Sequence, residues 1–333
     1  MKQIIRKIQY SLYRFMAFYA VAIPSVLAII FNKSKEPLFS YRCLLLYLLK
    51  RDYFPFYSQV NFRDRFTFHQ DKDFPFVVYN NDTYFYSNKW SKELIIDNFN
   101  STLNEQNIGS PHRYLSTDEI KEGWVIYDIG AAEGLQAKEW SKKTKQIIIF
   151  EPDETQCVCL RKTFESEIKN GKVIIIQEGV SNEHKEIQYG KQVFTVDSLS
   201  HLVKKYKLPA PNFIKADIEG EEMHLLEGAK DVIANPNIEV VQITSYHRPH
   251  DSENIAQFFS QYSGKGESSE GVTLVNRDGL ETVIFTFHHP IIRKCLYTFR
   301  FQLGPSKESL KNVPSIAIKR NESRTYPCSF QSN

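Results

Sequence analysis

The sequence predicts an α/β protein with a doubly wound, mostly parallel sheet, and three features of residues 119–290 predict it. Apolar runs of strand length recur from residue 124 onward, and most lack the polar alternation of a strand that has one face in water. Helical patterns separate several of these runs, which is typical of a parallel sheet. Two late runs separated by "RDGL" resemble an antiparallel hairpin that closes the sheet.

The predicted strands lie in short, β-favouring stretches. They are "WVIYDI", "QIIIFE", "KVIIIQE", "NFIKADI" and "IEVVQITSY", followed by the late pair "GVTLVN" and "ETVIFTF". The clearest helix is "EEMHLLEGAKDVI", where one apolar stripe contains Leu225, Leu226, Ala229, Val232 and Ile233.

The composition of the 333 residues excludes several classes of protein. A net charge of +3 is small for a surface dedicated to nucleic acid. The five cysteines are scattered without a CxxC pair, which predicts neither a disulfide framework nor a zinc site and favours a reducing compartment. The nine histidines show no HExxH spacing, so we assign no metal ligand and leave metal dependence open.

Two regions flank the predicted sheet. Residues 36–118 form an aromatic-rich N-terminal extension, in which the Asn-rich step at residues 80–82 predicts a hairpin and "SKELIIDNFNSTLNEQ" a helix that begins near Ser91. Residues 291–333 form a C-terminal tail to which we assign no chemistry.

Residues 1–35 are basic, amphipathic and apolar. "KQIIRKIQYSLYR" has helical apolar spacing, and residues 15–31 follow without a charge, at the lower limit of a membrane-spanning helix and interrupted by Pro24. Peripheral contact with a membrane and a buried helix hairpin with "YRCLLLYLLK" both fit this pattern. We expect a cytoplasmic protein, and the membrane alternative places it on the cytoplasmic face.

The stretch "VIYDIGAAEGL" predicts a floor for a nucleoside-containing cofactor. Asp128 ends a strand, Gly130 and Ala132 permit a turn with close approach of a ligand, and Gly134 opens the next helix. The spacing D-x-G-x-x-x-G differs from the G-x-G-x-x-G of dinucleotide sites, so it favours a cofactor without phosphates.

Two further strand ends complete the predicted cofactor site. Glu151 follows the second strand, 23 residues after Asp128, where a carboxylate suits a ribose diol. Glu178 and Gly179 follow the third strand, where an adenine edge is expected. S-adenosylmethionine combines ribose, adenine and a cationic amino-acid tail without phosphate, and fits these features.

At residues 195–229 the chain resembles the FkbM-type methyltransferases. The matching pieces cover about residues 124–264 in the order of the family: "DIGAAEG", "IIFEPD", "TVDSL", "FIKADIEGEEMHLLEGA" and "SYHRPHD". The resemblance implies a class I, Rossmann-like fold that uses S-adenosylmethionine, usually to methylate hydroxyl oxygens of sugars, lipids or secondary metabolites. The chain departs from the pattern at Ala132, where many relatives carry asparagine, which puts a hydrogen bond to the cofactor from this position in doubt.

Three residues are candidates for the reaction. Asp217 ends a central strand, and Glu219 would face the same side in extended chain. Two carboxylates on one face can hold a divalent cation, orient a sugar diol or stabilise a cationic partner; the alternative is that Glu219 caps the next helix. His247 follows the adjacent strand, and imidazole, with a pKa of about 6.5, is a suitable general base for a hydroxyl acceptor. For His112 and Arg113 we expect a surface position, and the alternative is contact with an acidic or glycan acceptor.

The expected function is thus O-methylation of a glycan, a glycolipid precursor or a secondary metabolite, with no nucleic-acid partner. The alternatives are a non-catalytic nucleoside-binding scaffold, a nicotinamide oxidoreductase, which the missing G-x-G-x-x-G disfavours, and a nucleic-acid methyltransferase, which the modest charge disfavours. The acceptor and the oligomeric state cannot be read from the sequence.

Overall fold

The computed structural model describes residues 61–189, 192–248, 250–269, 273–275 and 291–302. In this part of the chain no helix is long and apolar enough to cross a membrane. The predicted membrane-contact segment, residues 1–35, lies outside the described residues.

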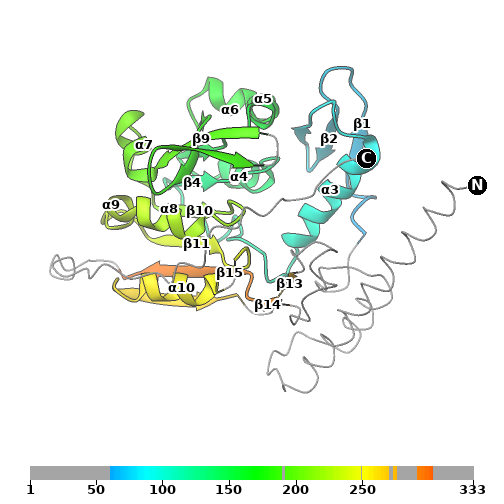
Figure 1. Ribbon diagram of the computed structural model, residues 1–333. Helices are drawn as coiled ribbons and strands as arrows, with labels where there is room; N and C mark the ends of the chain where they lie inside the picture. Colours follow the sequence, from blue (N-terminus) through cyan, green and yellow to red (C-terminus); the bar gives the residue numbers. More distant parts are fainter. Residues whose placement is uncertain (1–60, 190–191, 249, 270–272, 276–290, 303–333) are drawn as a thin grey trace, which may run out of the picture.

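A seven-stranded sheet dominates the structure, and its strand order is β12-β15-β11-β10-β4-β5-β6 (Figure 1). The strands are β4 (Val125–Ile129), β5 (Gln146–Phe150), β6 (Val173–Ile176), β10 (Phe213–Ala216), β11 (Val240–Thr244), β12 (Gly264–Ser268) and β15 (Leu296–Phe301). Within this sheet β15 alone runs antiparallel to its neighbours β11 and β12. The predicted doubly wound, mostly parallel sheet with an antiparallel strand is confirmed.

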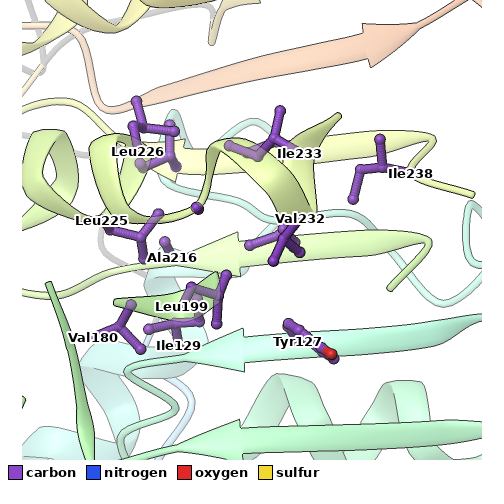
Figure 2. Packing of buried hydrophobic residues seen from close by; sticks show 14 of the residues in the cluster. Tyr127, Ile129, Val180, Leu199, Ala216, Leu225, Leu226, Val232, Ile233 and Ile238 are labelled. Carbon is purple, nitrogen blue, oxygen red and sulfur yellow. The ribbon is translucent and has the colours of Figure 1, made fainter. Parts of the chain in front are cut away.

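Helices cover both faces of the sheet, because alternate residues of each strand point to opposite faces. The helices are α4 (Leu135–Ser141), α5 (Glu154–Thr163), α6 (Glu165–Lys169), α7 (Leu199–Lys205), α8 (Glu222–Gly228), α9 (Lys230–Ile233) and α10 (Asp251–Phe259). Tyr127 and Ile129 of β4 belong to one buried cluster, together with residues of α7 to α10, whereas Ile126 packs into a second cluster with Trp140 of α4 and Leu160 of α5. Figure 2 shows the first cluster, in which Leu225, Leu226, Val232 and Ile233 lie over the sheet.

The predicted apolar stripe of residues 221–233 is confirmed as a buried surface, but it belongs to two helices. The first, α8, ends at Gly228, and Ala229 separates it from α9. A Cβ atom on Gly228 would lie 2.3 Å from the carbonyl oxygen of Ser181, so this turn packs directly on neighbouring backbone.

Smaller sheets surround the main one. One contains β1 (Thr67–His69), β2 (Phe76–Tyr79) and β3 (Asp82–Phe85), followed by helix α3 (Lys92–Glu105); the others are β7 (Gly179–Ser181) with β8 (Lys185–Tyr189) and β9 (Gln192–Ser198), and the pair β13 (Thr273–Val275) and β14 (Ile291–Arg293). The predicted hairpin is confirmed by Asn80 and Asn81, which adopt φ values of 49° and 66° between β2 and β3. The predicted helix is confirmed as α3, whose first turn is capped by Ser91.

The C-terminal part of the sheet differs from the prediction. The sequence predicts a C-terminal tail from residue 291. In the structure, Leu296–Phe301 instead forms β15 between β11 and β12. The predicted late hairpin falls mostly on residues 276–290, outside the described residues, and Thr273–Val275 pairs instead with Ile291–Arg293. The sequence does not predict this strand, because "LYTFRF" is an isolated run whose partner strands are distant in sequence.

Candidate active site

The order of the strands reverses between β4 and β10. The chain runs from β4 to β5 and β6 on one side, and later to β10 and β11 on the other. Ligands of open α/β sheets bind beyond the carboxyl ends of the strands at such a switch point. The segments that begin at Gly130 after β4 and at Asp217 after β10 therefore frame the candidate site.

The glycines after β4 are required by the packing of the protein itself. Gly130 has φ +78°, and a Cβ atom there would lie 1.9 Å from the carbonyl oxygen of Asp217. Gly134 has φ +82°, and a Cβ atom there would lie 2.6 Å from Cε2 of Phe164. Ala132 also adopts a positive φ, 48°. The predicted turn is confirmed, and the close approach that Gly130 permits in this structure is to the loop after β10.

Asp128 lies beneath this turn in a buried ion pair. Its Oδ1 is 3.0 Å from Nζ of Lys215 on β10, and the same ammonium donates to the carbonyl oxygen of Gly130. Burial raises the pKa of Asp128, although Lys215 acts in the opposite direction. Lys215 thus ties the end of β4 to β10, and the predicted contact between Asp128 and a cofactor stays a prediction.

The two other predicted cofactor carboxylates lie at the ends of β5 and β6. Glu151 accepts a hydrogen bond of 2.9 Å from the backbone N–H of Asp153, and burial raises its pKa to about 7. Glu178 receives hydrogen bonds at Oε1 from Lys205, at 2.6 Å, and from the Tyr206 hydroxyl. Gly179 packs against Val196, whose Cγ1 would lie 2.7 Å from an added Cβ atom.

Three predicted catalytic side chains meet on the other side of the switch point. Nε2 of His247 lies 3.5 Å from Oδ1 of Asp217 and 3.8 Å from Oε2 of Glu219. The structure brings the two carboxylates together, but not through the extended chain that the sequence predicts: β10 ends at Ala216, and Glu219 has φ 57° in a turn. Glu219 is not the helix cap either, since α8 begins after Glu221.

His247 is held from behind by Glu222, the first residue of α8. Oε1 of Glu222 lies 2.5 Å from Nδ1 of His247 and accepts a further hydrogen bond from Thr244, at 3.0 Å. Burial alone would lower the pKa of His247, but Glu222, together with Asp217 and Glu219, raises it to about 9. The resting form at neutral pH is therefore an imidazolium among carboxylates, and a role as general base requires that this proton first leave.

A second histidine reaches the same carboxylate. Nε2 of His112 lies 3.6 Å from Oδ2 of Asp217, which accepts a 2.8 Å hydrogen bond from the Tyr114 hydroxyl. The His112 ring contacts the edges of Tyr114 and Tyr246. His112 is only 4% exposed, so the prediction of a surface position was wrong, and burial lowers its pKa to about 4. Arg113 is half-buried.

The sequence held signals for two site residues that were not predicted. Glu222 shares a helical face with Leu225, Leu226 and Ala229. A carboxylate on this apolar stripe predicts a buried charge that needs a partner. Lys215 is a charged residue inside an otherwise apolar strand, where burial requires a partner. No spacing rule connects Tyr114 with Asp217, which is 103 residues away.

Comparison with known proteins identifies the domain. Residues 128–265 match the model of the methyltransferase FkbM domain. Hexuronic acid methyltransferase AglP of Haloferax volcanii is 26% identical over 180 residues, which are 49% of this chain and 71% of that protein.

Solved structures of methyltransferases are similar to part of the chain. Methyltransferase FkbM of Methylobacillus flagellatus is 18% identical with a TM-score of 0.42, over 59% of this chain and 47% of that chain. The C-terminal domain of precorrin-6Y C5,15-methyltransferase of Rhodobacter capsulatus is 12% identical with a TM-score of 0.35, over 55% of this chain and 82% of that chain. At such low TM-scores, the fold assignment rests on the observed sheet. The resemblance to the FkbM-type methyltransferases seen in the sequence is confirmed, because residues 128–265 match the methyltransferase FkbM domain.

Proposed function

We propose that the protein transfers a methyl group from S-adenosylmethionine to a hydroxyl oxygen of a glycan or glycolipid precursor. One observation carries the proposal: at the switch point, the loop after β4, which is the predicted donor-binding loop, contacts the loop after β10 at Gly130 and Asp217. The second loop contributes Asp217 and Glu219 to a cluster of ionisable groups with His247. The relative that acts on a hexuronic acid favours a sugar acceptor.

The residues on the donor side fit S-adenosylmethionine in their chemistry. Glu151 directly follows β5, where its carboxylate suits the hydroxyls of a ribose. Glu178 has its Oε1 occupied by Lys205 and Tyr206, while Oε2 is buried and accepts no hydrogen bond within the described residues. A buried acceptor of this kind fits the amino group of an adenine. The carboxylate of Asp217, at the edge of the donor loop, favours a nearby sulfonium charge.

When bound, the donor supplies an activated methyl group, and the electrons of its S–C bond return to sulfur as the C–O bond forms. The protein then has to align the acceptor oxygen and remove its proton, and alignment supplies most of the rate. Asp217 and Glu219 are placed to accept hydrogen bonds from sugar hydroxyls, since their side chains are 20% and 52% exposed. His247 takes the acceptor's proton in this scheme once it has lost its own, and Glu222 fixes its ring.

The test combines donor binding with a search for the acceptor. Calorimetry should show binding of S-adenosylmethionine and of S-adenosylhomocysteine, and none of NAD. Mass spectrometry of cell-envelope glycans should lose one methyl group when the gene is deleted. Binding of NAD alone would contradict the proposal, and donor binding without turnover on any glycan would favour the scaffold alternative.

A further inference from the structure

The cluster after β10 and β11 has the dimensions of a cation site. One ligand atom from each of Asp217, Glu219 and His247 lies within 4.8 Å of the others. Divalent cations bind carboxylate oxygen and imidazole nitrogen at about 2.1 Å, so two ligands of one ion lie at most about 4.2 Å apart. The separations of 3.5 Å and 3.8 Å from Nε2 of His247 already satisfy this limit. The carboxylate oxygens of Asp217 and Glu219 lie within 4.8 Å of each other, and any excess over the limit of about 4.2 Å would be closed by Glu219, whose side chain is 52% exposed.

Glu222 orients His247 as a ligand. Glu222 occupies Nδ1 at 2.5 Å and is itself fixed by Thr244, at 3.0 Å, and by the backbone N–H of Ile218, at 3.2 Å. This contact directs Nε2 towards Asp217 and Glu219. A carboxylate behind the imidazole is the usual arrangement for histidines that bind metals.

His112 gives an independent indication that a ligand binds beside Asp217. Its side chain is 5% exposed, and within the described residues neither ring nitrogen has a hydrogen-bond partner. Nε2 nevertheless points at Asp217, 3.6 Å from Oδ2, with Tyr114 and Tyr246 against the ring. Nδ1 lies 3.9 Å from Oε2 of Glu105, which is also beyond hydrogen-bond distance. A buried imidazole that makes no hydrogen bond is costly unless a ligand or an ordered water supplies one.

We propose that Asp217, Glu219 and His247 bind one divalent cation, with His112 in reach of a water molecule on that ion. Imidazole suits first-row transition metals and carboxylates suit Mn²⁺ and Mg²⁺, so the mixed set favours Mn²⁺. The inference goes beyond the proposed function, because the ion can be bound and measured without donor or acceptor. It also changes the role of His247, since a nitrogen bound to a metal cannot accept the proton of the acceptor.

The experiment is a titration of the purified full-length chain with MnCl₂, followed by electron paramagnetic resonance of free Mn²⁺, after dialysis against EDTA and then metal-free buffer. The wild type should bind one ion, and Glu219→Gln and His247→Ala should each weaken binding at least about tenfold. Glu219 is exposed and lies in a turn, so Glu219→Gln is expected to fold. Asp231→Asn is the matched control, because this carboxylate is 76% exposed on α9, faces Lys204 and should leave binding unchanged.

The outcomes separate this inference from the proposed function. Calorimetry with S-adenosylmethionine on the same metal-free protein reports donor binding independently. A wild type that binds the donor but not Mn²⁺ overturns the metal site alone. Binding of Mn²⁺ that Glu219→Gln and His247→Ala leave unchanged also overturns it, because the ion then lies elsewhere. Loss of one Mn²⁺ in both variants, with the fold intact by circular dichroism and the control unaffected, supports it.

Discussion

The two sides of the switch point differ in how much of their chemistry is already satisfied by the protein. On the donor side, Gly130 and Gly134 are required by contacts with Asp217 and Phe164, and Asp128 is paired with Lys215. On the other side, the side chains of Asp217, Glu219 and His247 converge on a partly exposed position. The comparison teaches that packing explains the sequence motif after β4, whereas the geometry of the Asp217 cluster fits the cation proposed above.

The largest effect is expected at Asp217, where the two sides meet. Asp217→Asn removes the charge that faces His247, His112 and the expected sulfonium, so turnover should fall by about 10²- to 10⁴-fold. Donor affinity should change much less, because ribose and adenine contacts lie elsewhere. Steady-state kinetics and calorimetry with S-adenosylmethionine check this, and Asp231→Asn should behave like wild type. Equal losses in turnover and donor affinity would place Asp217 in the donor site.

The next effect is expected at Glu151, on the donor side. At pH 8.5, above its raised pKa of about 7, Glu151 is a carboxylate, and Glu151→Gln should weaken the binding of S-adenosylmethionine by about 1.5–3 kcal/mol because hydrogen bonds to a charged group are lost. The neighbouring Glu154→Gln on α5 is the control. Calorimetry measures both variants, and wild-type affinity in Glu151→Gln would remove this residue from the donor site.

Gly130→Ala tests the contact that joins the two sides. The added Cβ atom would overlap the carbonyl oxygen of Asp217, and a side chain at φ +78° is strained, so the free energy of unfolding should fall by about 1–3 kcal/mol. Gly171→Ala is the control, since its φ is +74° but nothing lies within 4 Å of its added Cβ atom. Denaturant unfolding compares them, and an equal loss in both variants would show that φ, and not the contact, decides the cost.

The smallest effect is expected from pH. Folding raises the pKa of His247 from 6.5 to about 9, so its stabilising contribution is complete below about pH 6.5 and is lost as the pH rises through about 9. In EDTA, the midpoint of thermal unfolding should fall by a few degrees between pH 7.5 and 9.5, and this fall should be smaller in His247→Gln. The groups that set this pKa are Glu222, Asp217 and Glu219, and Asp251 interacts with the same histidine. An equal fall of the thermal unfolding midpoint with pH in the wild type and in His247→Gln would contradict the protonated state of His247 at neutral pH.

Much of the fold could be predicted from the sequence, because buried parallel strands are continuous apolar runs and need no knowledge of distant partners. The late strand β15 could not, since its position depends on pairing with β11 and β12. In the site, Asp217, Glu219 and His247 follow strand ends that topology brings together. His112 and Tyr114 precede the sheet and reach Asp217 only through tertiary packing. Glu222 was not predicted as a site residue, although it shares the buried face of α8.

The most direct measurement is a crystal structure of the protein with S-adenosylhomocysteine. The account predicts the ribose at Glu151, the adenine near Glu178, and the sulfur at the Gly130 loop facing Asp217 and His247. Adenosyl density elsewhere, or side chains that fill the junction between the loops after β4 and β10, would contradict it.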